Sequence, residues 1–172
     1  MNDKFILDAC CGTKMMWTNK NHPNTLYIDI RKEPKGFILE QENSEINPDI
    51  QCSFTNLPFE DKKFKLIVCD PPHIIGKRIT GIIMKKFGCL NPETWQDDLR
   101  KGFKEMWRCL DDYGTLILKW NDVSIPYKKM LSYISEEPLF YNILAGEKAK
   151  KEKNTYWFCF MKIPDKTSKE IK

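Results

Sequence analysis

Long apolar runs and histidines are scarce in this chain of 172 residues. No run approaches the roughly 18 apolar residues that mark a membrane-spanning helix, and the first residues lack the pattern of a signal peptide. His22 and His73 are the only histidines, so a metal centre built on histidine ligands is not expected. These absences favour a cytoplasmic protein that binds no metal.

The chain contains seven cysteines, and their spacing shows no metal-binding or disulfide pattern. Their number is odd, no two of them are spaced as Cys-x-x-Cys, and several lie within apolar runs. This distribution argues against a zinc site and against a disulfide framework. It favours reduced thiols in a cytosol.

Neither sign of charge dominates the composition. Lysine and arginine number 28 against 24 acidic residues, a net charge of +4, which permits an anionic partner without requiring one. A hydrophobic content of 41% is ordinary for a globular protein, and the length suits one hydrophobic core. We expect a single domain over residues 1–164 and a polar tail over 165–172.

Short apolar segments alternate with turns and helical patterns along the chain. Strands are predicted where β-branched and aromatic residues gather, at residues 4–10, 25–31, 49–54, 64–69, 115–120, 139–144 and 156–161. Helices are predicted over residues 14–20, 91–111 and 126–137. Residues 73–93 are expected to form a functional loop or a partly disordered segment. This order indicates an α/β three-layer sandwich with a mostly parallel sheet that ends in an antiparallel pair.

An acid, two prolines and a histidine end the apolar run of residues 64–69. The prolines fix φ at two successive positions and remove two backbone donors, and Pro71 keeps Asp70 out of the helical region. The result is a stiff corner at the carboxyl end of a strand, the edge of an open α/β sheet where ligands bind. The alternative is a proline turn capped by a solvated aspartate.

Two further features lie at the ends of the first two predicted strands. Residues 8–13 read Asp-Ala-Cys-Cys-Gly-Thr, a loop of small residues whose backbone can approach a ligand. It is neither a P-loop nor Gly-x-Gly-x-x-Gly, so phosphate binding is not indicated. Asp29 ends the second strand, where a carboxylate can accept hydrogen bonds from ribose hydroxyls. The ordered set of loop, acid and Asp-Pro-Pro indicates a ligand site more strongly than its parts do.

These motifs resemble those of class I S-adenosylmethionine-dependent methyltransferases. The loop at Asp8 is similar to the family's first motif, in the form seen in enzymes that methylate amino groups of nucleic acids. Asp70-Pro71-Pro72-His73 is similar to their Asp-Pro-Pro-aromatic motif. The likeness covers roughly residues 4–162 and implies a Rossmann-like, mostly parallel sheet of seven strands with a C-terminal antiparallel hairpin. The compact domain also resembles enzymes of phage or mobile-element origin.

The resemblance implies a role for each matching residue. The residues that would hold S-adenosylmethionine are Asp8, Ala9, Cys10, Cys11 and Gly12 at its methionine end, Asp29 at its ribose, and Ile30, Ser53 and Phe54 at its adenine. The catalytic residues would be Asp70, Pro71, Pro72 and His73. Asp70 and the Pro71 carbonyl would accept hydrogen bonds from the target amine, and His73 would stack on the target base. Lys14 stands where the family has a second glycine, and His73 stands in place of a larger ring.

The implied function is methylation of an exocyclic amino group of a nucleic-acid base, with adenine N6 in DNA as the first choice and an RNA base as the second. Basic residues of two loops would contact phosphates: Lys77, Arg78, Lys85 and Lys86, and the stretch Lys148–Lys153. Solvated lysines are the competing interpretation of both loops.

Two different functions stay open for the chain as a whole. One is methyl transfer to a small molecule or a protein, and the second is that of a non-catalytic cofactor-binding subunit. The domain has no room for an inserted recognition domain, so a partner subunit is a further candidate for target recognition.

Overall fold

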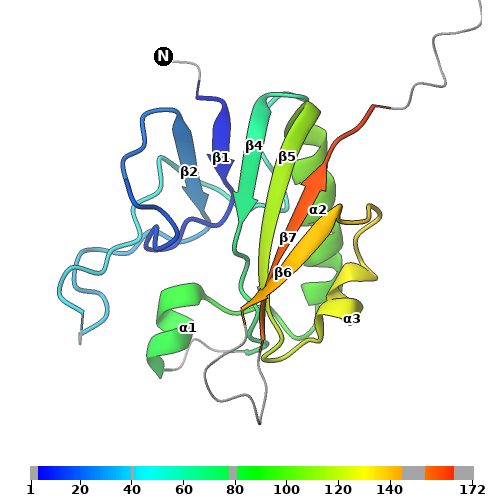
Figure 1. The fold of residues 1–172 in the computed structure, drawn as a ribbon. Helices are drawn as coiled ribbons and strands as arrows, with labels where there is room; N and C mark the ends of the chain where they lie inside the picture. The colour runs from blue at the N-terminus through cyan, green and yellow to red at the C-terminus, as the bar shows by residue number, and fades with distance from the viewer. Residues whose placement is uncertain (1–3, 40, 78–80, 145–153, 165–172) are drawn as a thin grey trace, which may run out of the picture.

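A computed structural model describes residues 4–39, 41–77, 81–144 and 154–164. Seven strands form one sheet in the order β3-β2-β1-β4-β5-β7-β6 (Figure 1). The parallel strands are β1 (Ile6–Asp8), β2 (Thr25–Asp29), β3 (Ile50–Gln51), β4 (Phe64–Cys69) and β5 (Leu110–Asn121). Strand β7 (Thr155–Met161) pairs antiparallel with β5 and with β6 (Phe140–Leu144). The predicted α/β architecture, with its mostly parallel sheet and C-terminal antiparallel pair, is confirmed.

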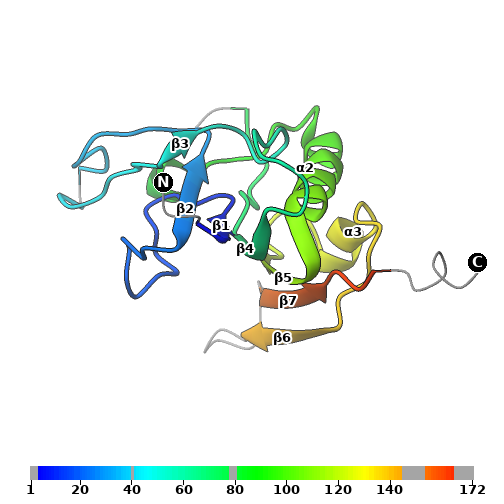
Figure 2. The same ribbon diagram turned by 90° about the horizontal axis from the view of Figure 1, so that it is seen from above.

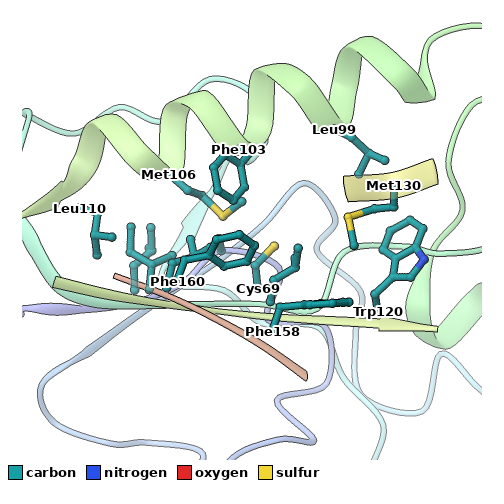
Figure 3. Packing of buried hydrophobic residues seen from close by; sticks show 14 of the residues in the cluster. Cys69, Leu99, Phe103, Met106, Leu110, Trp120, Met130, Phe158 and Phe160 are labelled. Carbon is teal, nitrogen blue, oxygen red and sulfur yellow. The ribbon is translucent and has the colours of Figure 1, made fainter. Parts of the chain in front are cut away.

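Helices α2 (Trp95–Cys109) and α3 (Tyr127–Leu131) cover one face of the sheet (Figure 2). Figure 3 shows Leu99, Phe103 and Met106 of α2 directed at the strands, where they meet buried residues such as Phe158 and Phe160. Burying one such side chain contributes roughly 1.5–3 kcal/mol. Packing against the sheet therefore stabilises a helix that, at 15 residues, is marginal in isolation.

Turns rather than a helix cover the opposite face of the sheet beside β1 and β2. Trp17 lies there: its Nε1 donates to Asp8 Oδ2 over 2.7 Å, and its ring packs edge-on against Tyr27. The helix predicted over residues 14–20 is wrong, because residues 9–24 form turns and Lys14 has a φ of 55°, outside the helical region. The turns keep the loop after β1 short and close to the sheet.

Four other predicted elements have clearly different bounds in the structure. Strand β3 is only two residues long, so Ser53 and Phe54 follow the third strand instead of ending it. The helix predicted to start near residue 91 starts at Trp95, because Asn91 accepts backbone N–H groups in a turn ahead of the helix. The helix predicted over residues 126–137 ends at Leu131. The fifth strand begins earlier than predicted, at Leu110.

The segment predicted as a long loop, residues 73–93, contains the short helix α1 (Gly81–Phe87). A bridge between Ile75 and Leu90 joins the two ends of this excursion, which we call the α1 arm and define as residues 74–77 and 81–90. Figure 1 shows α1 below the carboxyl ends of the central strands. The arm therefore returns to the strand edge from which it departs.

The remaining predictions concern the tail, the membrane and metals. Residues 165–172, the predicted polar tail, lie outside the described residues. Among the helices of the described residues, none is long and apolar enough to cross a membrane. All seven cysteines are free, and within the described ranges no group of three or more His, Cys, Asp or Glu side chains is placed to hold a metal ion.

Candidate functional site

A cavity of about 540 Å³ lies at the carboxyl ends of β1, β2 and β4. The predicted site residues that line it are Ala9, Cys10, Cys11, Gly12, Asp29, Ile30, Ser53, Phe54, Asp70 and Pro72. Its volume falls within the roughly 300–1,000 Å³ of small-molecule and cofactor sites. The loop after β1, Asp29 at the end of β2 and the corner after β4 therefore meet at one cavity. Asp8, Pro71 and His73 are the predicted residues outside its described walls.

Asp8 holds the first loop from behind. Its side chain is fully buried, Oδ1 accepts a hydrogen bond from the Cys10 backbone N–H, and Oδ2 accepts one from Trp17. Burial raises the pKa of Asp8 to about 7; the bonds from Trp17 and Cys10 oppose the rise, and the charges of Asp70 and Asp29 add to it. In this arrangement Asp8 fixes the turns of residues 9–17 instead of facing the cavity.

Lys14 occupies the position at which the resembling family has a second glycine. Its φ of 55° lies in the left-handed region that glycine favours, so the backbone of the loop turns as a glycine would allow. The Lys14 ammonium lies 4.2 Å from the centre of the Tyr27 ring. This cation–π contact places the charge over the face of the sheet that carries Trp17.

Asp29 lines the cavity and already accepts several hydrogen bonds. Oδ2 accepts from the Gly12 N–H at 2.9 Å, and Oδ1 accepts from the Arg31 N–H at 2.9 Å. The Arg31 guanidinium adds longer bonds of 3.2 Å to Oδ1 and 3.4 Å to Oδ2. A carboxylate accepts about four hydrogen bonds, so a ribose would take the places of the two guanidinium bonds.

Arg31 also reaches the α1 arm, and sequence reasoning missed it. Its guanidinium donates to the carbonyl of Lys85 over 2.9 Å and to that of Lys86 over 3.5 Å. Gly88 allows this close approach: its φ is 77°, and a Cβ there would lie 3.3 Å from Pro72 and 3.6 Å from the Arg31 guanidinium carbon. Arg31 thus connects Asp29 to the α1 arm, which forms one wall of the cavity.

The remaining wall on this side is apolar and rests on α2. Ile30 is 65% exposed and lines the cavity. Phe54 packs directly on Gly102 of α2, where an added Cβ would lie 2.1 Å from two ring atoms. Glycine is therefore required at position 102 for the Phe54 ring to approach the helix this closely. Ile30 and Phe54 together provide apolar surface for a planar ring.

Asp70 follows β4, and its side chain, 12% exposed, lines the cavity. Lys119 of β5 donates to Asp70 Oδ2 over 2.6 Å. Sequence reasoning missed this lysine as well. The pairing of Cys69 with Leu118 places the next residues of both strands side by side, and that register is not visible in the sequence.

His73 ends this corner and is not among the described walls of the cavity. Its ring centre is 6.2 Å from that of Phe87 and 6.5 Å from that of Trp120. Its Nδ1 atom is buried and has no hydrogen-bond partner among the described residues. Burial lowers the pKa of His73, and the charge of Asp70 opposes this in part. The aromatic ring of the arm that lines the cavity is Phe87.

The predicted basic contacts are only partly described. Lys77 is exposed and pairs with Glu93 at 3.3 Å, Lys85 is exposed, and Lys86 lines the cavity. Arg78 and Lys148–Lys153 lie outside the described residues.

No protein-family model matches the chain, and no curated protein matches it either. Solved structures do match. An S-adenosylmethionine-dependent methyltransferase from Methanosarcina mazei superposes with a TM-score of 0.55 at 12% identity, over 93% of this chain and 92% of that chain. The 1,6-didemethyltoxoflavin-N1-methyltransferase of Burkholderia thailandensis, solved with S-adenosylhomocysteine, gives 0.53 at 13% identity over 92% and 71%. A methyltransferase from Leishmania major gives 0.51 at 14% over 92% and 66%. The chain has the fold of class I S-adenosylmethionine-dependent methyltransferases.

Proposed function

We propose that this protein is an S-adenosylmethionine-dependent N-methyltransferase that acts on the exocyclic amino group of a nucleic-acid base, adenine N6 in DNA. One observation carries the proposal. Asp70, the acid of the Asp-Pro-Pro-His corner, lines the same cavity as the small-residue loop and Asp29. A catalytic acceptor and a nucleoside cofactor site therefore share one space within a methyltransferase fold.

The cavity fits S-adenosylmethionine in volume and in the chemistry of its walls. The backbone of Cys10 to Gly12 would hold the methionine end, and Asp29 would accept the ribose hydroxyls in place of the Arg31 guanidinium. The apolar surfaces of Ile30 and Phe54, with Ser53 beside them, would take the adenine. The bound cofactor supplies a methyl group on a positively charged sulfur.

Asp70 would act on the other reactant. The exocyclic amine of a base is a poor nucleophile, because its lone pair is delocalised into the ring. Two fixed acceptors, the Asp70 carboxylate and the Pro71 carbonyl, would draw the amine out of the ring plane and aim it at the methyl group. Positioning and electrostatics then provide most of the catalysis. Pro71 and Pro72 hold both acceptors on a corner with restricted φ.

The aromatic groups beside the corner suit a base that has left its stack. A base in a duplex must be flipped out before its amine can react, and a stacking ring stabilises it there. Phe87 lines the cavity, and His73 packs against it. We assign the contact with the base to Phe87, with His73 stacking on the base or supporting Phe87 from behind.

The basic residues of the α1 arm favour a nucleic acid as the substrate. Lys85 is exposed on α1 and Lys86 reaches the cavity wall, so phosphates on either side of a flipped base would meet positive charge. Such contacts make binding salt-dependent. We expect the affinity for DNA to fall as salt is raised from about 50 to about 200 mM.

Radiolabel transfer tests the proposal. The purified chain is incubated with tritiated S-adenosylmethionine and either DNA from a methylation-free strain or unmodified RNA transcripts, and the nucleosides are separated after digestion. We expect labelled N6-methyladenine from DNA, with transfer by Asp70→Ala reduced about 100-fold. Label in RNA alone would make RNA the substrate and leave the role of Asp70 intact. Label in neither polymer would contradict the proposal and favour a small-molecule or protein substrate.

A further inference from the structure

Lys119 contacts the catalytic carboxylate although it lies outside the described walls of the cavity. Its ammonium is 2.6 Å from Asp70 Oδ2, and no described residue forms a hydrogen bond with Oδ1. We propose that Lys119 is a positioning residue, which fixes Asp70 Oδ2 and leaves Oδ1 for the target amine. This inference rests on the proposed function, in which Asp70 accepts a hydrogen bond from that amine.

Lys119 is itself held on both sides. It lies within β5, opposite Trp157 of β7, and its ammonium is 5.8 Å from the centre of the Trp157 ring. Asp70 continues β4 on the other side of β5. The three side chains therefore form a row across β4, β5 and β7, and a cation–π contact supports the ammonium from the side away from Asp70.

The burial of this pair points to a role in the site. The two side chains are 24% and 12% exposed. Lys65 and Asp111 also join β4 to β5, at the other end of the strands, but the Lys65 side chain is 65% exposed. An exposed pair contributes about 0–1 kcal/mol, and replacing a buried pair with apolar residues is often neutral for stability. Control of orientation explains the Lys119–Asp70 pair better than stability does.

The chemistry needs a hydrogen-bond acceptor that is held in place beside the amine. As the nitrogen–carbon bond forms, the sulfur–carbon bond breaks, its electron pair stays on sulfur as a neutral thioether, and the amine nitrogen later releases a proton to solvent. Lys119 donates to Asp70 Oδ2 and no described residue bonds to Oδ1, so Oδ1 is the oxygen that can accept from the amine. The other titratable groups near Asp70 are Asp8 of β1 and His73 of the corner.

A binding measurement and a kinetic measurement test the proposal on the full chain. The variants are Lys119→Met, Lys119→Arg and, as a matched control on the same two strands, Lys65→Met. Calorimetry gives the Kd of S-adenosylmethionine for each variant. We expect the Lys65→Met control to keep the wild-type kcat.

The kinetic measurement separates positioning from structure. We expect Lys119→Met to lower kcat for methyl transfer to DNA at least tenfold at pH 7, with the Kd of S-adenosylmethionine unchanged within twofold. Lys119→Arg restores most of the rate. Lys119→Gln replaces the methionine variant if circular dichroism shows that the latter does not fold.

The outcomes separate the role of Lys119 from the function of the protein. If the wild type methylates DNA or RNA and Lys119→Met keeps the wild-type kcat, the proposed role of Lys119 is wrong while the proposed function stands. A loss of kcat in Lys65→Met equal to that in Lys119→Met, or no rescue by Lys119→Arg, also overturns this role and would make the pair structural. If the wild type methylates neither DNA nor RNA, the proposed function fails, and the role of Lys119 in it fails too.

Discussion

Two strand-end acids in this protein each meet a basic side chain, yet their surroundings differ. Asp29, the last residue of β2, accepts hydrogen bonds from two backbone N–H groups and two longer bonds from the Arg31 guanidinium, which fill its capacity. Asp70 after β4 meets Lys119 on one oxygen, and the described residues leave the other oxygen to the cavity. Asp29 therefore has all its acceptor positions occupied, whereas Asp70 keeps one oxygen without a hydrogen bond from the described residues.

The difference separates two tasks within one cavity. Asp29 can bind a ligand only by exchanging partners, and the partner it would exchange, Arg31, is also attached to the α1 arm. Asp70 needs no exchange, because its cation lies away from the open oxygen. Binding at Asp29 is therefore coupled to the arm, while Asp70 is ready to accept a hydrogen bond.

The largest expected effect is opposite behaviour of the two acids. Asp70→Ala should reduce methyl transfer about 100-fold and leave the Kd of S-adenosylmethionine within twofold. Asp29→Asn should weaken S-adenosylmethionine about tenfold, because a hydrogen bond to a charged group is worth roughly 1.5–3 kcal/mol. Calorimetry measures the affinities, and single-turnover labelling measures the rates. Equal losses of affinity in both variants would remove the distinction.

A smaller effect is expected from cutting the link between Asp29 and the arm. Arg31→Ala removes the bonds to the Lys85 and Lys86 carbonyls, so α1 should open more often. We expect amide hydrogen exchange at residues 84–88 to become about tenfold faster, because exchange reports local opening. Lys32→Ala, an exposed neighbour, serves as the control. Exchange in Arg31→Ala as slow as in the control would show that the arm is held by other contacts.

The ionisation of Asp8, the third acid near the site, should make the stability of the protein depend on pH. Burial raises the pKa of Asp8 from 3.8 to about 7. Between those values the unfolded chain loses this proton and the folded chain keeps it, so the stability contributed by Asp8 falls as pH rises. Asp8→Asn keeps an oxygen for Trp17. Its free energy of unfolding, relative to that of the wild type, should rise by roughly 1–3 kcal/mol from pH 4.5 to pH 7.5. Urea unfolding at both pH values measures this gain.

Asp49 provides a control of opposite sign. Its partial burial acts to raise its pKa, but hydrogen bonds from Lys4 and the Tyr27 N–H lower the pKa overall. Its contribution to stability is therefore present above its unfolded pKa and is lost as pH falls. Asp49→Asn should lose stability relative to wild type as pH rises. If Asp8→Asn shows the same sign as Asp49→Asn, the burial of Asp8 does not govern its ionisation.

The sheet was largely predictable from local sequence. The run at residues 64–69 is apolar and is closed by two prolines, and β4 has those bounds, Phe64–Cys69. The loop after β1 and the acids at positions 29 and 70 then follow from strand ends, and the cavity brings them together. These features depend on neighbours along the chain, which the sequence displays.

Features that depend on distant partners were not predictable. Arg31 meets carbonyls of the α1 arm, and Lys119 meets Asp70 only through the register of β4 and β5. The sequence pattern predicts a helix over residues 14–20, and such a helix gives no indication of the contact between Trp17 and the buried Asp8. Tertiary contacts thus turn a predicted ligand residue, Asp8, into a support for the loop.

Mass spectrometry of nucleosides tests the central claim most directly. DNA and RNA from cells that express the wild type, Asp70→Ala or no protein are digested and screened for methylated bases. We predict N6-methyladenine in the DNA of cells with the wild type, and none above background in the other two. Wild-type cells without any additional methylated base, or Asp70→Ala cells with the same amount as wild type, would contradict this claim.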